Sequence, residues 1–169
     1  MTCTCTNKGH VLFVCSGNTC RSPMAEAFAN HYIGEEGLDH IFFATSAGTA
    51  VWKRLPAAVP AVRVMKEYGL DISRHKAKSV EDVFIPDTFL ILGMTTEHVD
   101  LLKCLFPEKA SCVFRFTDYV FPEESSCGDI PDPYGLDLEA YRYVAGILER
   151  LARGLVKRLS KERDSFQTK

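Results

Sequence analysis

One stretch, from Val11 to Ser22, constrains the fold of this chain more than any other. It reads V-L-F-V-C-S-G-N-T-C-R-S and runs directly into Pro23. Its continuous apolar start predicts a strand buried on both faces of a parallel sheet. Ser22 suits the N-cap of a helix, and Pro23 suits the first helical position. A short loop between a strand and a helix N-terminus presents backbone N–H groups together with the helix dipole, so the stretch predicts an anion-binding loop.

Apolar runs and helical patterns alternate along the rest of the chain. The pattern predicts strands at 11–14, 41–46, 89–92 and 112–116, helices at 23–33, 56–69, 95–106 and from 137 onward, a short helix at 80–84, and a long irregular loop at 117–136. Such alternation favours an α/β fold with three layers, in which helices cover both faces of a four-stranded parallel sheet. We expect a flexible extension at 1–9 and a single domain at 10–165. Ligands bind such sheets beyond the carboxyl ends of their strands, where the first loop lies.

Composition excludes several function classes. The net charge of −2 gives no basic field for nucleic acid, and no apolar run approaches the length of a membrane span. The N-terminus lacks the features of a signal peptide, so a cytoplasmic protein with reduced cysteines is expected. Cys3 and Cys5 would suit a metal only if a second pair stood at ligand spacing, and none does; a loose polar tail is the favoured interpretation. No cofactor is expected.

The loop carries a candidate nucleophile. The loop amides, the helix N-terminus and Arg21 all favour the thiolate form of Cys15. The planar guanidinium of Arg21 matches two oxygens of a phosphate group. Gly17 is expected to allow a positive φ and a close backbone approach, and Asn18 tolerates the left-handed region. Ser22 is close enough to donate its hydroxyl to the sulfur. Attack of Cys15 on phosphorus would give a phosphocysteine, which water then hydrolyses.

The leaving group of that reaction needs a proton donor. The best candidate is Asp132, in the segment G-D-I-P-D-P-Y-G at 128–135, because prolines on both sides stiffen its backbone. An aspartate before a proline is also a common turn former. Asp129 in the same segment is the rival acid.

The loop C-S-G-N-T-C-R-S-P at 15–23, together with D-P-Y at 132–134, resembles the low-molecular-weight protein tyrosine phosphatase family, which includes phosphotyrosine and phosphoarginine protein phosphatases. The resemblance extends from Val11 to about Leu159. It implies a phosphorylated protein as substrate and hydrolysis of its phosphomonoester without a metal. It also assigns phosphate binding to the loop residues Ser16, Gly17, Asn18, Thr19 and Cys20.

The resemblance further implies supporting roles. Ser46 and His75 match positions that hydrogen-bond the loop asparagine, here Asn18, although alone they would be a strand-end serine and an exposed loop histidine. Cys20 matches a second loop cysteine that can form a disulfide with the nucleophile and protect it from over-oxidation. The alternative for Cys20 is a small buried residue beneath the loop.

The choice of substrate depends on three residues. Trp52 matches a crevice-wall aromatic of tyrosine-specific relatives, and Tyr134 would form the opposite wall, so a flat phenyl ring fits between them. A deep crevice would also exclude phosphoserine. Thr19 favours phosphoarginine instead, because the phosphoarginine phosphatases of the family carry threonine there. We therefore predict phosphotyrosine, with phosphoarginine as the alternative.

Two other functions are less well supported. Arsenate reduction uses a related loop and relays a disulfide through further cysteines, but Cys104 and Cys112 are expected to pack in the core. A catalytically inactive phosphate-binding or redox-sensing module is disfavoured by the complete set of Cys15, Arg21 and Asp132.

Overall fold

The central sheet has four parallel strands in the order β2-β1-β3-β4. The computed structural model describes residues 8–83, 88–123 and 128–167. The strands are β1 (Gly9–Cys15), β2 (Phe42–Gly48), β3 (Thr88–Gly93) and β4 (Val113–Arg115). Strand β1 is central, and its last residue, Cys15, pairs with Gly48 of β2. The predicted parallel sheet is therefore confirmed, with the loop at 16–20 at its carboxyl edge.

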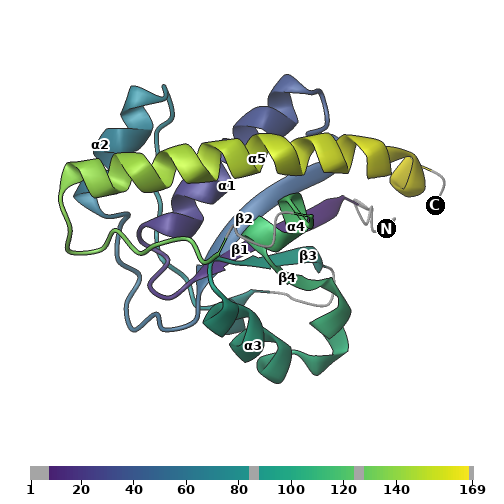
Figure 1. Ribbon diagram of the computed structural model, residues 1–169, viewed down its shortest axis with the longest axis horizontal. Helices are drawn as coiled ribbons and strands as arrows, with labels where there is room; N and C mark the ends of the chain where they lie inside the picture. The colour runs from purple at the N-terminus through teal and green to yellow at the C-terminus, as the bar shows by residue number, and fades with distance from the viewer. Residues whose placement is uncertain (1–7, 84–87, 124–127, 168–169) are drawn as a thin grey trace, which may run out of the picture.

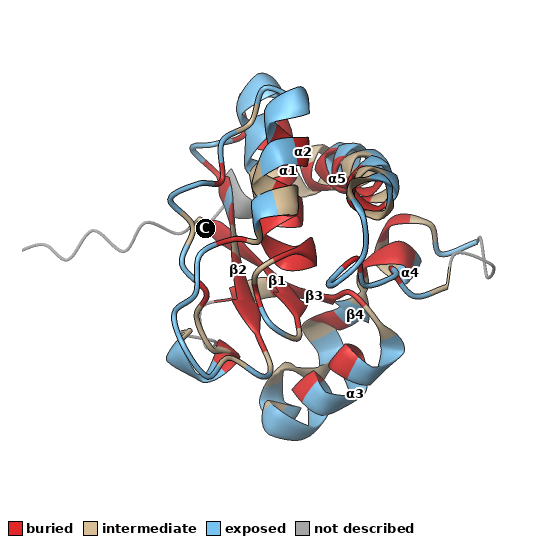
Figure 2. Ribbon diagram, turned by 90° about the vertical axis from the view of Figure 1, so that its left-hand side faces the viewer, coloured by how far each residue is buried: buried red, intermediate tan, exposed pale blue. Residues whose placement is uncertain are grey.

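Helices cover both faces of this sheet. They are α1 (Arg21–Glu35), α2 (Val59–Glu67), α3 (Thr96–Leu105), α4 (Phe116–Val120) and α5 (Leu138–Gln167), with 3₁₀ turns η1 (Val80–Asp82) and η2 (Pro107–Cys112). Helix α5 runs across the molecule beside α1, whereas α3 lies on the other side of the sheet (Figure 1). Figure 2 shows the buried strands between these two helical layers. The three-layer α/β/α prediction is confirmed.

Strand β1 contributes to two cores. Val11 and Phe13 belong to the larger cluster, which includes α1 and α5. Leu12 and Val14 belong to a smaller cluster with Val99 and Leu102 of α3. Alternate residues of a strand point to opposite faces, so an apolar residue is needed at every position of a strand covered on both sides.

Several predicted boundaries were wrong. Helix α1 begins at Arg21, one residue before the predicted cap, and α2 begins at Val59 because Pro56 pairs with Lys76 in an isolated bridge. The region at 117–136 is not all irregular, since α4 occupies its start and shortens the predicted fourth strand. Val120 of α4 packs against α5 so closely that an added Cβ at Gly154 would lie 2.3 Å from its Cγ1.

Some sequence predictions fall outside the described residues. They concern Cys3 and Cys5, most of the extension at 1–9, and Phe84 at the end of the predicted short helix, whose described part is η1. Within the described ranges, no helix is long and apolar enough to cross a membrane.

Candidate active site

Backbone hydrogen bonds hold the phosphate loop, residues 16–20, against the segment that follows β2. The carbonyl groups of Cys15 and Ser16 accept from the N–H groups of Thr49 and Ala50, each at 3.0 Å. Asn18 adopts the left-handed region with φ of 52°, as expected. Gly17 does not have a positive φ, and a Cβ there would meet only the side chain of Thr19, at 3.5 Å. The expected positive φ at Gly17 was therefore wrong.

The close approach to the loop is made by Gly48, at the end of β2. A Cβ on Gly48 would lie 2.4 Å from the carbonyl oxygen of Ser16 and 3.0 Å from the nitrogen of Asn18. The sequence pattern did not single out this glycine. The steric demand arises because β2 pairs with β1 up to Cys15, which places Gly48 directly beneath the loop.

The side chain of Asn18 orders the hydrogen bonds around the nucleophile. Its Nδ2 donates to Ser22 Oγ and to Ser46 Oγ, both at 2.9 Å. An amide nitrogen is only a donor, so the hydrogen of Ser22 stays available for Cys15 Sγ, 2.9 Å away, or for the Ala47 carbonyl at 3.3 Å. Asn18 therefore leaves the hydroxyl hydrogen of Ser22 free to be donated to Cys15 Sγ.

Groups from three other segments hold Asn18. His75 Nε2 lies 2.7 Å from the Asn18 carbonyl oxygen and donates to it, and the backbone N–H of Lys78 donates to Oδ1 at 3.0 Å. Burial lowers the pKa of His75, although its bond to Asn18 opposes this shift. Ser46 in turn donates to Glu26 Oε2 at 2.5 Å. The contacts expected of Ser46 and His75 are present, whereas sequence analysis missed Glu26, four residues beyond Ser22 on α1.

Arg21 and Asp132 form an ion pair across the site. Arg21 Nη2 lies 2.6 Å from Asp132 Oδ2, and Nη1 donates to the carbonyl of Ile130 at 3.2 Å. The Arg21 side chain is 5% exposed and that of Asp132 49%. Arg21 Nε is buried and has no hydrogen-bond partner among the described residues. This donor is therefore free for an incoming anion.

The rival acid, Asp129, is engaged elsewhere. Its Oδ1 accepts from Arg115 Nη1 at 3.0 Å and from the N–H of Thr96 at 2.9 Å. Burial raises its pKa, but the hydrogen bonds from Arg115 and Thr96 outweigh burial and leave that pKa lowered. Asp129 does not line the cavity that Asp132 lines, so Asp132 is the better placed of the two carboxyl groups.

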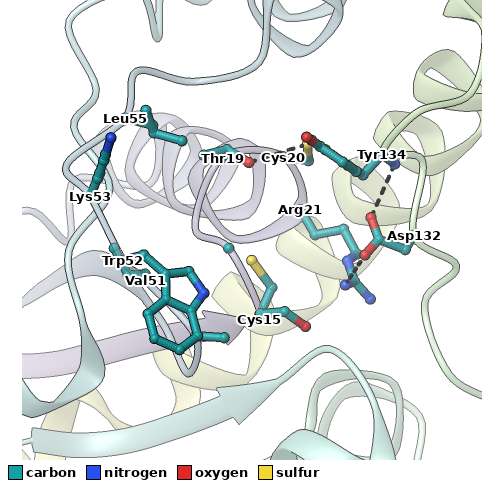
Figure 3. Close-up of a pocket in the computed structure, with 13 residues that line it drawn as sticks. Cys15, Thr19, Cys20, Arg21, Val51, Trp52, Lys53, Leu55, Asp132 and Tyr134 are labelled. Atoms are coloured by element: carbon teal, nitrogen blue, oxygen red, sulfur yellow. Dashed lines mark hydrogen bonds and ion pairs between the residues drawn. The ribbon is translucent and has the colours of Figure 1, made fainter.

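A cavity of about 330 Å³ opens above the phosphate loop. Residues 50–53 and Leu55 border one side, and Asp132 and Tyr134 border the opposite side (Figure 3). Trp52 is 93% exposed and Tyr134 73% exposed, so both aromatic rings stand at the mouth. Cys15, by contrast, is 2% exposed at the base. Only a group that extends down past the two rings reaches the sulfur.

The described cysteines are all free. Cys20 Sγ lies 3.4 Å from Tyr141 OH of α5 and 3.6 Å from Thr19 Oγ1, and burial raises the pKa of its thiol. Its pairing with Cys15 in a disulfide stays a prediction. Cys104 is exposed on α3, so its expected place in the core was wrong, and Cys112 is half-buried. Neither lines the cavity, so neither of these two described cysteines is placed to relay a disulfide from Cys15.

His98 is a further residue that sequence analysis missed. Its Nε2 lies 2.9 Å from Ser16 Oγ, and its Nδ1 lies 2.8 Å from Oγ1 of Thr95, the N-cap residue of α3. Burial and the nearby charge of Arg21 lower the pKa of this histidine. The only sequence signal is its position in the first turn of the helix that follows β3. Among the described residues, no cluster of three or more histidine, cysteine or acidic side chains could hold a metal ion.

Comparison with known proteins agrees with this geometry. The model of the low molecular weight phosphotyrosine protein phosphatase family matches residues 10–165. The chain belongs to this family. Members are cysteine-dependent hydrolases, and the family acts on phosphorylated proteins. The resemblance inferred from the loop at 15–23 and the segment at 132–134 is thereby confirmed.

Relatives of this phosphatase carry two different names. A protein-arginine-phosphatase of Bacillus subtilis is 33% identical, over 90% of this chain and 98% of the relative. The low molecular weight protein-tyrosine-phosphatase Etp of Escherichia coli is 30% identical, over 89% and 95%. The crystal structure of a low molecular weight protein tyrosine phosphatase from T. tengcongensis superposes with a TM-score of 0.81 at 40% identity, covering 89% of this chain and 99% of that one.

Proposed function

We propose that this phosphatase hydrolyses phosphotyrosine in proteins through a phosphocysteine intermediate. The observation that carries the proposal is the joint placement of Cys15, Arg21 and Asp132 at one cavity, with Trp52 and Tyr134 at its mouth. A phenyl ring between two aromatic side chains would place its phosphate at the loop, because aromatic rings favour offset-stacked or edge contacts.

Substrate binding would exchange the partner of Arg21. The ion pair with Asp132 occupies one Nη group, and the orphaned Nε faces no other acceptor in the described structure. A phosphate dianion takes two parallel hydrogen bonds from a guanidinium, which a single carboxylate oxygen does not match. We expect the phosphate to displace Asp132, whose carboxyl group then faces the leaving oxygen.

The chemical steps follow from these positions. The Cys15 thiolate attacks phosphorus, the phosphorus–oxygen bond to the tyrosine breaks, and Asp132 transfers its proton to the phenolate oxygen. In the second step Asp132, now a carboxylate, takes a proton from water as that water attacks the phosphocysteine. The Ser22 hydroxyl, 2.9 Å from Sγ, stabilises the thiolate that leaves. The loop amides and Arg21 stabilise the charge on the transferred phosphoryl group.

The Cys15→Ser variant tests the covalent route. A serine hydroxyl is a far weaker nucleophile here, so turnover of p-nitrophenyl phosphate should fall by at least about 1000-fold. Inorganic phosphate should still bind, because the loop amides and Arg21 remain. Substantial residual turnover would contradict a phosphocysteine intermediate.

A phosphoarginine substrate is the second candidate. Thr19 supports it, since this residue lines the cavity and matches the phosphoarginine phosphatases of the family. The 33% identity to the protein-arginine-phosphatase of Bacillus subtilis supports it as well. Trp52 and Tyr134 support phosphotyrosine, which therefore stays the first candidate, with phosphoarginine second.

Comparing phosphotyrosine and phosphoarginine peptides of one sequence decides between the two substrates. We expect a higher kcat/KM for the phosphotyrosine peptide. In the Thr19→Ile variant, the ratio of phosphotyrosine to phosphoarginine turnover should rise further. A wild-type preference for phosphoarginine would overturn the proposal, and a ratio unchanged by Thr19→Ile would show that Thr19 is not the selector.

A further inference from the structure

The two sides of the cavity mouth differ in charge. The segment at 52–78 carries seven basic and two acidic residues, whereas the segment at 129–139 carries four acidic residues and no basic one. The chain as a whole has a net charge of −2, so the basic segment departs strongly from the rest of the protein. Lys53 and Asp132 mark the two sides in Figure 3.

The cations of the first side come from two backbone segments that pair with each other. Pro56 pairs with Lys76 in an antiparallel bridge, and Ala77 N–H donates to the carbonyl of Leu55 at 2.8 Å. The segment at 76–78 therefore lies directly beside 54–56. We call the exposed basic side chains of these two segments and of the residues near them the basic wall: Lys53, Arg54, Arg74 and Lys76.

The charges of the two sides also differ in how they are paired. None of the four basic-wall residues forms an ion pair with a carboxylate in the described ranges. On the opposite side, Asp129 pairs with Arg115, Asp132 with Arg21, and Glu139 with Arg142. Unpaired cations near one rim set up a positive potential there, whereas three of the four acids on the other side are already paired with arginines.

We propose that the basic wall binds an acidic segment of the substrate polypeptide that flanks the phosphorylated residue. The inference rests on the proposed function of the cavity. Cys15 lies at the base, 2% exposed, so any polypeptide that delivers a phosphorylated side chain to it must cross the rim. Trp52, which lines the cavity beside Lys53 and is 93% exposed, adds apolar area to that crossing. A flat anionic membrane would fit less well, because it would also meet the acidic side of the mouth.

The charge difference makes the preference directional. One flank of the peptide leaves over the basic wall, and the other leaves over the paired acids, so acidic residues should help on one flank only. Each exposed ion pair changes an association constant by about 1.4- to 5-fold. Two such pairs predict an advantage of about 10-fold at low ionic strength, which should largely disappear in about 0.5 M salt.

Three phosphotyrosine peptides test this: one with two aspartates before the phosphorylated residue, one with two after it, and one with serines at all four positions. We expect one acidic peptide to exceed the serine peptide about 10-fold in kcat/KM, and the other to gain nothing. We express the advantage as the ratio of kcat/KM for the favoured acidic peptide to kcat/KM for the serine peptide. The Arg54→Glu/Arg74→Glu variant should reduce this ratio to about 1. The Lys103→Glu/Lys161→Glu variant, with the same change in net charge on α3 and the far part of α5, should retain the advantage.

The outcomes separate the two proposals. Equal rates for all three peptides, equal gains from both acidic peptides, or an advantage that survives Arg54→Glu/Arg74→Glu would overturn the basic wall as a docking surface. If no phosphotyrosine peptide is hydrolysed, the proposed function fails, and the same series with phosphoarginine tests the basic wall by itself. The wild-type protein could instead show no peptide preference and sediment with vesicles of phosphatidylserine and phosphatidylcholine. If the Arg54→Glu/Arg74→Glu variant then failed to sediment, the basic wall would be assigned to a membrane.

Discussion

Gly48→Ala should damage catalysis without contacting the substrate. The new Cβ would lie 2.4 Å from the Ser16 carbonyl oxygen, whereas ordinary contacts begin near 3.4 Å. The carbonyl also accepts from the N–H of Ala50, so a shift of this carbonyl strains that hydrogen bond as well. The phosphate loop must therefore retreat by about 1 Å. A misplacement of this size costs about 100-fold in rate, or about 2.7 kcal/mol of transition-state stabilisation.

The assay is p-nitrophenyl phosphate turnover, with thermal unfolding followed by circular dichroism in parallel. The matched control is Gly34→Ala on α1, where an added Cβ meets nothing within 4 Å. Alanine there should leave kcat unchanged and raise the free energy of unfolding by about 0.5–1 kcal/mol, because glycine is the poorer helix former. If Gly48→Ala unfolds cooperatively yet keeps its kcat within about threefold of the wild type, the steric argument is refuted.

Three further predictions concern single side chains. Asp132→Asn should lower the turnover of phosphotyrosine by about 100-fold or more, and the turnover of p-nitrophenyl phosphate, which has the better leaving group, much less. An equal loss for both substrates would show that another acid protonates the leaving group. His98→Ala and Ser16→Ala should each lower kcat about fivefold, because each removes the same hydrogen bond. The double variant should lose no more than either single variant. Additive losses would show that His98 does not act through Ser16. Burial and the charge of Lys78 lower the pKa of His10 from 6.5 to about 4. Between these two values the unfolded chain binds more protons than the folded chain, so the free energy of unfolding decreases as the pH is lowered. We expect urea unfolding to report a loss of about 2 kcal/mol between about pH 7 and pH 4.5 that His10→Gln reduces, and an identical loss in that variant would exclude His10.

The sheet and the reacting groups could be predicted because their signals are local. A strand covered on both faces reads as a continuous apolar run, and the nucleophile, the arginine and the helix start lie within one short stretch. Asp132 is distant from Cys15 in sequence, yet its two flanking prolines mark it. The supporting contacts of Asn18 were reached through the family resemblance rather than through any pattern of the chain itself.

The missed features all depend on contacts between distant segments. His98 contacts Ser16 although the two residues are 82 positions apart in the sequence, and no periodic pattern in the sequence predicts such a contact. Gly48 and Gly17 also show that the sequence does not reveal contacts between distant segments. A loop considered alone assigns conformational freedom to its own glycine, but the steric constraint comes from the neighbouring strand, whose register only the sheet determines. Helix α4 was missed for a related reason, since it is held by Val120 against Gly154 of α5.

The contact between Cys20 and Tyr141 has a consequence for the order in which the enzyme is made. The nucleophile and its loop leave the ribosome early, whereas Asp132 and the tyrosine that contacts the loop follow more than a hundred residues later. A nascent chain that ends before these residues carries a reactive thiol without its proton donor and without the helix that supports the loop. We therefore expect phosphatase activity to begin only after α5 has packed against α1.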